Sequence, residues 1–219
     1  MRWKARSITR SLFGLPILFA LIGVSPAQAE VLEEDNLHVR TWNNFALNVY
    51  QLHERLIKEK SVRIETHLGG YPNQPDWHYQ EQKFFDNADN RLISLIQWDG
   101  NVEGQLHTIE VYLRDDQGRV VRDYTAAFLP SYHNAPVQTL ISLHHYHQGL
   151  HGFRSFDASG YRIVERCQGT YQGKPVELLL DEDEIDDMQY DKDSVMQSDI
   201  YEACFGDLPT EAGIYLQPQ

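Results

Sequence analysis

The chain has 219 residues, with 32 Asp and Glu against 19 Lys and Arg, which gives a formal net charge of −13. This charge argues against nucleic acid or an anionic membrane surface as a partner, because both are bound through clustered Lys and Arg. Hydrophobic residues make up 42% of the chain, enough for a packed core, so wholesale disorder is excluded. The length fits a single domain.

Residues 1–29 have the pattern of a secretory signal peptide. Four basic residues lie in the first ten positions, an apolar run follows from Leu12 to Val24, and Ala27 and Ala29 match the small positions of an A-x-A cleavage site. The apolar run has 13 residues, fewer than the roughly 20 that a membrane-spanning helix needs. We therefore expect cleavage between Ala29 and Glu30 and a periplasmic or secreted location. The remaining 190 residues have 15 basic and 32 acidic side chains, a net charge of −17.

Cys167 and Cys204 are the two cysteines of the chain. In an oxidising compartment such a pair usually forms a disulfide. The loop between them has 36 residues, so the bond is expected to contribute about 3 to 4 kcal/mol. A redox pair or two metal thiolates would be the functional alternative, but no C-x-x-C spacing supports it.

A helix is predicted over residues 33–60. Its apolar residues recur every three to five positions and form one stripe, and Asp35 or Asn36 is suited to cap its start. The stripe consists of Leu37, Trp42, Phe45, Val49, Leu52 and Leu56.

After Lys60 the apolar period changes to two, which is typical of strands with one polar face. Segments rich in Asp, Asn and Gly separate the strand candidates and favour tight turns. The candidates are Val62 to Leu68, Trp77 to Phe85, Arg91 to Trp98, Leu106 to Arg114, Arg119 to Leu129, Thr139 to His147, Phe153 to Phe156, Tyr161 to Tyr171 and Pro175 to Asp181.

One helix followed by about seven to nine strands predicts a mainly β fold, an antiparallel β-meander that is either barrel-like or a strongly curved sheet packed on the helix. In outline this resembles the lipocalin-like barrels, although no family motif is present. We expect one domain over 30–219, with the meander at about 61–181 and an acidic C-terminal segment at 182–219. Phe45, Trp42, Phe128 and Leu140 are expected in the core.

The most unusual segment is 144–151, which holds four of the ten histidines. On a strand, His145 and His147 project from one face, about 6 to 7 Å apart at Cα. Either His151 or His133 is a candidate third ligand for Zn²⁺ or another transition metal. The alternative is a polar strand whose imidazoles pair with carboxylates and hold no metal.

The stretch from Glu177 to Asp207 contains 12 acidic residues and one base, Lys192. The EF-hand pattern is not met, because Ile185 interrupts it and no Gly follows. We expect a solvated, self-repelling loop after the last strand. A docking surface for a basic partner and a Ca²⁺ site are the alternatives.

Sequence motifs for catalysis are missing: the chain has no G-x-S-x-G, P-loop, G-x-G-x-x-G or S-x-x-K pattern. Trp77 and Tyr132 lie near predicted loop ends, where aromatic side chains often line binding sites. The sequence therefore predicts an exported, non-catalytic binding or accessory protein of the cell envelope. Its partner would be a small ligand or an envelope protein with a basic surface, and no cofactor is predicted. The alternative is a metal-binding protein or metalloenzyme built on 144–151.

Overall fold

The computed structural model describes residues 36–70, 78–129 and 134–219, and the predicted signal peptide lies outside these ranges. The predicted helix is α1 (Leu37–Glu59). Asn36 caps it, because its side-chain oxygen accepts a hydrogen bond from the His38 backbone nitrogen at 2.9 Å. The buried face of α1 carries Val39, Phe45, Ala46, Val49, Leu52 and His53.

All nine predicted strands are present. Most ends agree with the prediction within two residues, and β7 begins three residues earlier than expected. The strands are β1 (Val62–Gly69), β2 (Tyr79–Asp86), β3 (Leu92–Asp99), β4 (Leu106–Arg114), β5 (Val120–Ala127), β6 (Gln138–His147), β7 (Leu150–Phe156), β8 (Arg162–Tyr171) and β9 (Lys174–Asp181).

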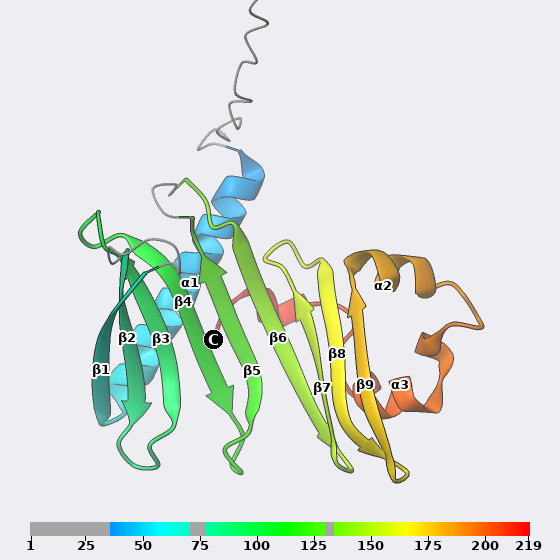
Figure 1. The fold of residues 1–219 in the computed structure, drawn as a ribbon. Helices are drawn as coiled ribbons and strands as arrows, with labels where there is room; N and C mark the ends of the chain where they lie inside the picture. The colour runs from blue at the N-terminus through cyan, green and yellow to red at the C-terminus, as the bar shows by residue number, and fades with distance from the viewer. Residues whose placement is uncertain (1–35, 71–77, 130–133) are drawn as a thin grey trace, which may run out of the picture. The chain divides into compact units, whose positions relative to one another are not determined.

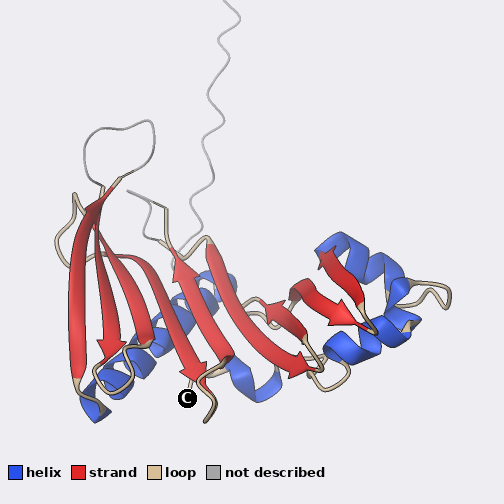
Figure 2. Cartoon of the chain, turned by 60° about the horizontal axis from the view of Figure 1, so that its bottom comes forward, coloured by secondary structure: helices blue, strands red, loops and turns tan. Residues whose placement is uncertain are grey.

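The strands form one antiparallel sheet in the order β1 to β9, each paired with its neighbours in sequence. The barrel-like alternative is wrong, since the sheet is not closed: β1 and β9 are its two edges (Figures 1 and 2). The curved-sheet alternative is consistent with the structure. Closure is not needed to shield the core, because α1 packs across β3, β4, β5 and β6 and covers their apolar face.

The core lies on one face of the sheet, between α1 and the middle strands, and continues between β7 to β9 and the residues that follow β9. Phe45 and Phe128 are buried there as expected, and Trp42 packs half-buried against it. Leu140 was expected in the core, and that prediction is wrong. Because neighbouring residues on a strand point to opposite faces, the fully buried Ile141 faces the core and the half-buried Leu140 faces away.

The acidic segment after β9 is not a loop. It forms α2 (Glu182–Met188), η1 (Val195–Gln197), α3 (Asp199–Phe205) and η2 (Gly213–Leu216). Asp181 and Glu184 form a capping box at the start of α2, each side chain accepting from the other's backbone nitrogen. Carboxylates in the first turn of a helix are favoured by its dipole. The acidic residues thus stabilise a helix start where self-repulsion was expected to keep the chain open.

Two features attach this C-terminal segment to the sheet. The predicted disulfide between Cys167 on β8 and Cys204 on α3 is present. Arg154 on β7 is 2% exposed and pairs with Glu165 on β8, which is 0% exposed. Arg154 also donates to the carbonyl oxygens of Leu208 and Pro209 at 2.8 and 2.7 Å. The C-terminal segment is therefore bound to β7 and β8 by a covalent bond and by buried polar contacts.

Candidate functional site

The histidine-rich segment 144–151 spans the end of β6, a two-residue turn and the start of β7. Both turn residues have positive φ, 47° at Gln148 and 86° at Gly149, as the tight turns of hairpins require. This turn sets the register, in which Tyr146 lies opposite His151 and His144 opposite Phe153. Residues paired in this way share one face of the sheet.

The four histidines divide between the two faces. His145 and His147 lie on the face that carries Ile141 and α1. His144 and His151 lie on the opposite face, on which none of the described helices packs (the uncovered face; Figure 1). The uncovered face also carries Tyr112, Asp123, Tyr146, Phe153 and Arg166.

A chain of hydrogen bonds joins three side chains of the uncovered face. Asp123 Oδ2 on β5 lies 2.6 Å from His144 Nε2, and His144 Nδ1 lies 2.9 Å from His151 Nε2. Because a carboxylate only accepts, His144 donates from Nε2, and its Nδ1 accepts from His151 when both rings are neutral. The order is therefore carboxylate, imidazole, imidazole, with Nδ1 of His151 at the end.

The environment of His151 disfavours a positive charge on its ring. Burial lowers the pKa of His151, and the nearby His144 and Arg166 lower it further. The terminal imidazole is therefore held as a neutral hydrogen-bonding group at a half-buried position.

Aromatic rings pack around the hydrogen-bonded side chains of Asp123, His144 and His151. The rings of Tyr146 and His151 stack with centroids 4.4 Å apart and planes 2° apart. The Arg119 guanidinium lies 4.7 Å from the centre of the Tyr146 ring, and the Tyr146 hydroxyl donates to the Val120 carbonyl at 3.0 Å. Phe153 lies 5.4 Å from the His144 ring. The cluster Asp123, His144, His151, Tyr146 and Phe153 (the histidine cluster) is thus a fixed aromatic and polar surface.

The predicted metal ligands are only partly brought together. The rings of His145 and His147 stack 5.8 Å apart, and His145 Nε2 lies 3.7 Å from Asp207 Oδ2. His151 lies on the opposite face, beside His144, and His133 lies outside the described residues. Over the described ranges, no group of three or more His, Cys, Asp or Glu side chains is arranged to hold a metal ion.

The predicted ligand-binding residues Trp77 and Tyr132 lie outside the residues that the structure describes. Their proposed role therefore stays a prediction from the sequence.

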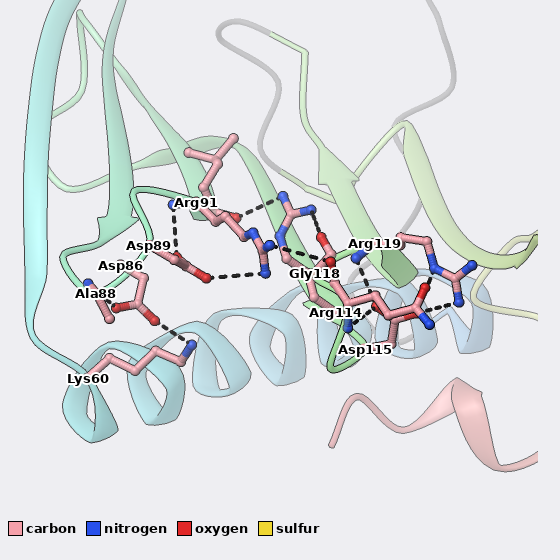
Figure 3. Close-up of polar contacts among 11 residues, drawn as sticks. Lys60, Asp86, Ala88, Asp89, Arg91, Arg114, Asp115, Gly118 and Arg119 are labelled. Atoms are coloured by element: carbon pink, nitrogen blue, oxygen red, sulfur yellow. Dashed lines mark hydrogen bonds and ion pairs between the residues drawn. The ribbon is translucent and has the colours of Figure 1, made fainter.

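A cavity of about 300 Å³ lies beside the C-terminus of α1 and the turns that join β2 to β3 and β4 to β5. Figure 3 shows the polar contacts of the side chains around it. Lys60 pairs with Asp86 at 2.7 Å, and Arg91 pairs with Asp89 at 3.3 Å. Arg114 donates to the carbonyl oxygens of Leu92 and Gly118 at 3.2 Å. These cations already have partners within the chain, so they hold two hairpins together and do not form a free anion site.

A larger cavity, of about 610 Å³, lies between β7, α3 and the C-terminal turns. The buried charge at the wall of this cavity is Arg154, which pairs with Glu165 and donates to two backbone carbonyls. Arg154 also donates to the Tyr201 hydroxyl at 3.2 Å. Arg154 therefore has its partners within the chain and is not a free cation at the wall of this cavity.

Sequence reasoning singled out the histidines and missed Asp123, Arg119 and Phe153. Their role depends on which residues of β5 and β7 lie beside β6, and no local pattern contains that information. Comparison with models of protein families, with curated proteins and with solved structures gave no significant match to this chain. No helix of the described residues is both long enough and apolar enough to cross a membrane.

Proposed function

We propose that this chain is an exported, non-catalytic binding or accessory protein of the cell envelope, which docks a protein partner on the uncovered face of its sheet. The observation that carries the proposal is the histidine cluster, an aromatic and polar surface held in place on a face without a covering helix among the described residues. Aromatic and Arg side chains are enriched in the cores of protein interfaces.

The open sheet favours a protein partner over a small ligand. A closed barrel would have offered an interior for a small molecule. Here the face toward α1 is filled by fully buried side chains such as Ile109, Val111 and Ile141. The expected mature charge of −17 favours a partner with a basic surface.

Export is tested first. The chain is produced with its full N-terminus in a bacterial host, and the periplasmic fraction is analysed by intact mass and N-terminal sequencing. We expect a chain that begins at Glu30. A chain that keeps residues 1–29, or that stays in the cytoplasm, contradicts the exported part of the proposal.

Docking is tested by photo-crosslinking in the same cells. A photoreactive amino acid replaces Arg166, which is exposed on the uncovered face opposite Phe153. The matched control is Leu47, 54% exposed on α1. We expect a discrete adduct from position 166, none from position 47, and at least a five-fold lower yield when His151→Ala is added. Equal adducts from both positions, or none from position 166, contradict docking on this face.

The metalloprotein remains the second candidate, and the stacked His145 and His147 pair is the observation that favours it. Protein purified from the periplasm without a tag or added metal is examined by native mass spectrometry. A stoichiometric metal that is lost in His145→Ala/His147→Ala supports this alternative. A metal-free chain contradicts it.

A further inference from the structure

The two edges of the sheet differ in how they are protected. Natural sheets block their edges with Pro, charges, bulges or covering elements, because an open edge pairs with other strands. At one edge, β9 carries Pro175, and α2 follows it and packs on β8 and β9 (Figure 1). At the other, β1 has eight residues, no Pro and no register shift against β2.

The outer edge of β1 presents regularly spaced backbone groups. The Ser61 carbonyl accepts from the Asn87 N–H and the Gly69 carbonyl from the His78 N–H, at the two ends of β2. The odd-numbered residues of β1 therefore turn their backbone groups toward β2. The N–H and C=O groups of Val62, Ile64, Thr66 and Leu68 therefore point outward. Within the described ranges, β2 is the only strand that pairs with β1.

Two large apolar side chains lie exposed along this edge. Ile64 is 54% exposed and Leu68 is 63% exposed. Both lie on the face that carries α1, but α1 packs mainly on β3 to β6, so among the described residues no helix covers this part of the face. An exposed apolar edge with free backbone groups is an interaction surface.

We propose that two copies of this chain pair antiparallel through β1, with a two-fold axis at Thr66. The sequence of β1 is self-complementary in this register. Ile64 then lies opposite the partner's Leu68, Glu65 lies opposite the partner's His67, and Thr66 faces its own copy. Apolar and Thr–Thr pairs are favourable cross-strand neighbours, and a carboxylate can accept a hydrogen bond from an imidazole N–H. Because the interface is isologous, the Ile64–Leu68 and Glu65–His67 pairs each occur twice, and the Thr66 pair lies on the axis and occurs once.

The register about Thr66 is preferred over the alternative about Ile64. Both use the outward backbone groups, but the axis at Thr66 pairs the whole of residues 63–69. The axis at Ile64 places the apolar Leu68 opposite Lys60, which follows the end of α1 and already pairs with Asp86. The paired copies form one continuous sheet, with nine strands from each chain.

The first test measures the molar mass of the mature chain in solution by light scattering, at chain concentrations from 5 to 200 μM. We expect twice the mass of one chain at the upper end of this range. Thr66→Pro removes an outward N–H and leaves the bonds to β2 intact, so it is expected to give the mass of one chain with an unchanged circular dichroism spectrum. A parent chain that stays single at 200 μM, or a Thr66→Pro variant that stays paired, overturns the proposal.

The register has its own test. The two native cysteines are joined to each other, so a new cysteine is the only free thiol of the variant. Opposite residues of a hydrogen-bonded antiparallel pair lie about 5.5 Å apart at Cα, within the range of a disulfide. Thr66→Cys is expected to form a covalent dimer in air, while Gln168→Cys, exposed on β8, does so at least ten-fold more slowly. Equal rates overturn the proposal.

Discussion

Two polar side chains are buried in the core between α1 and the sheet, and their surroundings differ. His53 is 3% exposed, its Nδ1 lies 2.7 Å from Ser94 Oγ, and its ring packs against Phe84. Burial lowers the pKa of His53 to about 4, so the ring is neutral in the folded protein. Tyr124 is 0% exposed, and its hydroxyl finds no hydrogen-bond partner among the described residues.

His53 makes stability depend on pH. In the unfolded chain the imidazole has a pKa of about 6.5. Between pH 6.5 and about 4 the unfolded chain therefore binds a proton that the folded chain does not, so the free energy of unfolding falls as the pH falls, by at most about 3 kcal/mol. Above pH 6.5 this contribution is constant. We expect the free energy of unfolding of His53→Gln, measured by urea unfolding between pH 4.5 and 7.5, to depend less on pH than that of the parent chain.

The control for this measurement is His38→Gln, which removes an exposed imidazole from the same helix. If the free energy of unfolding of His53→Gln depends on pH as strongly as that of the parent chain, His53 is not the source of this pH dependence.

The Tyr124 hydroxyl is expected to add nothing to stability. An unsatisfied buried hydroxyl carries a desolvation cost, so Tyr124→Phe should leave the free energy of unfolding unchanged or raise it by about 1 kcal/mol. Tyr201→Phe is the matched control, since that buried hydroxyl contacts Glu165 at 2.6 Å and Arg154 at 3.2 Å. Its loss should cost about 1 to 3 kcal/mol. Urea unfolding of both variants gives the comparison, and a larger loss from Tyr124→Phe would refute it.

At the scale of elements, β7 is the strand on which the C-terminal segment rests. A Cβ at Gly152 would lie 2.3 Å from the Cys204 carbonyl oxygen, so only glycine lets α3 approach the β7 backbone this closely. Two residues further on, Arg154 and Glu165 form a buried ion pair that Tyr201 and Arg162 complete. Such a pair is costly to break from one side, because the remaining charge stays buried.

Removing one member of this pair should loosen α3 and the residues after it. We expect Arg154→Met to lower the free energy of unfolding by about 3 to 5 kcal/mol. The double variant Arg154→Met/Glu165→Leu should lose less than this single variant, since no charge is left unpaired. Denaturant unfolding measures both, with Arg166→Met on the exposed side of β8 as the control, expected within about 0.5 kcal/mol of the parent. A double variant less stable than the single one would rule out this explanation.

At the scale of the whole molecule, one covalent bond links the end of the chain to the sheet. Cys167 and Cys204 are 37 positions apart, so the bond restricts the unfolded chain and ties α3 to β8. The disulfide should make the oxidised chain 2 Da lighter than the reduced one. Reduction should lower the free energy of unfolding by about 3 kcal/mol. Two free thiols in protein taken from the periplasm would contradict this prediction.

Much of the candidate site could not be predicted from the sequence. The H-x-H spacing correctly predicted that His145 and His147 share a face, because alternation along a strand is a local property. The pairing of His144 with Asp123 and His151 depends on the register of β5, β6 and β7, which the turns and the packed core set together.

The sequence by itself determined α1 and the nine strands of this protein. The helix stripe, the nine alternating segments and the Asp and Gly turns are local signals, and the single pair of cysteines left one choice of disulfide. The Asp181 and Glu184 capping box was also a local signal, although the density of charge around it suggested a loop. Tertiary structure alone decided that the sheet stays open, that Arg154 and Glu165 meet, and which residues surround His144. These depend on contacts between segments far apart in the chain, whose free energies add up only once the whole sheet and α1 have packed.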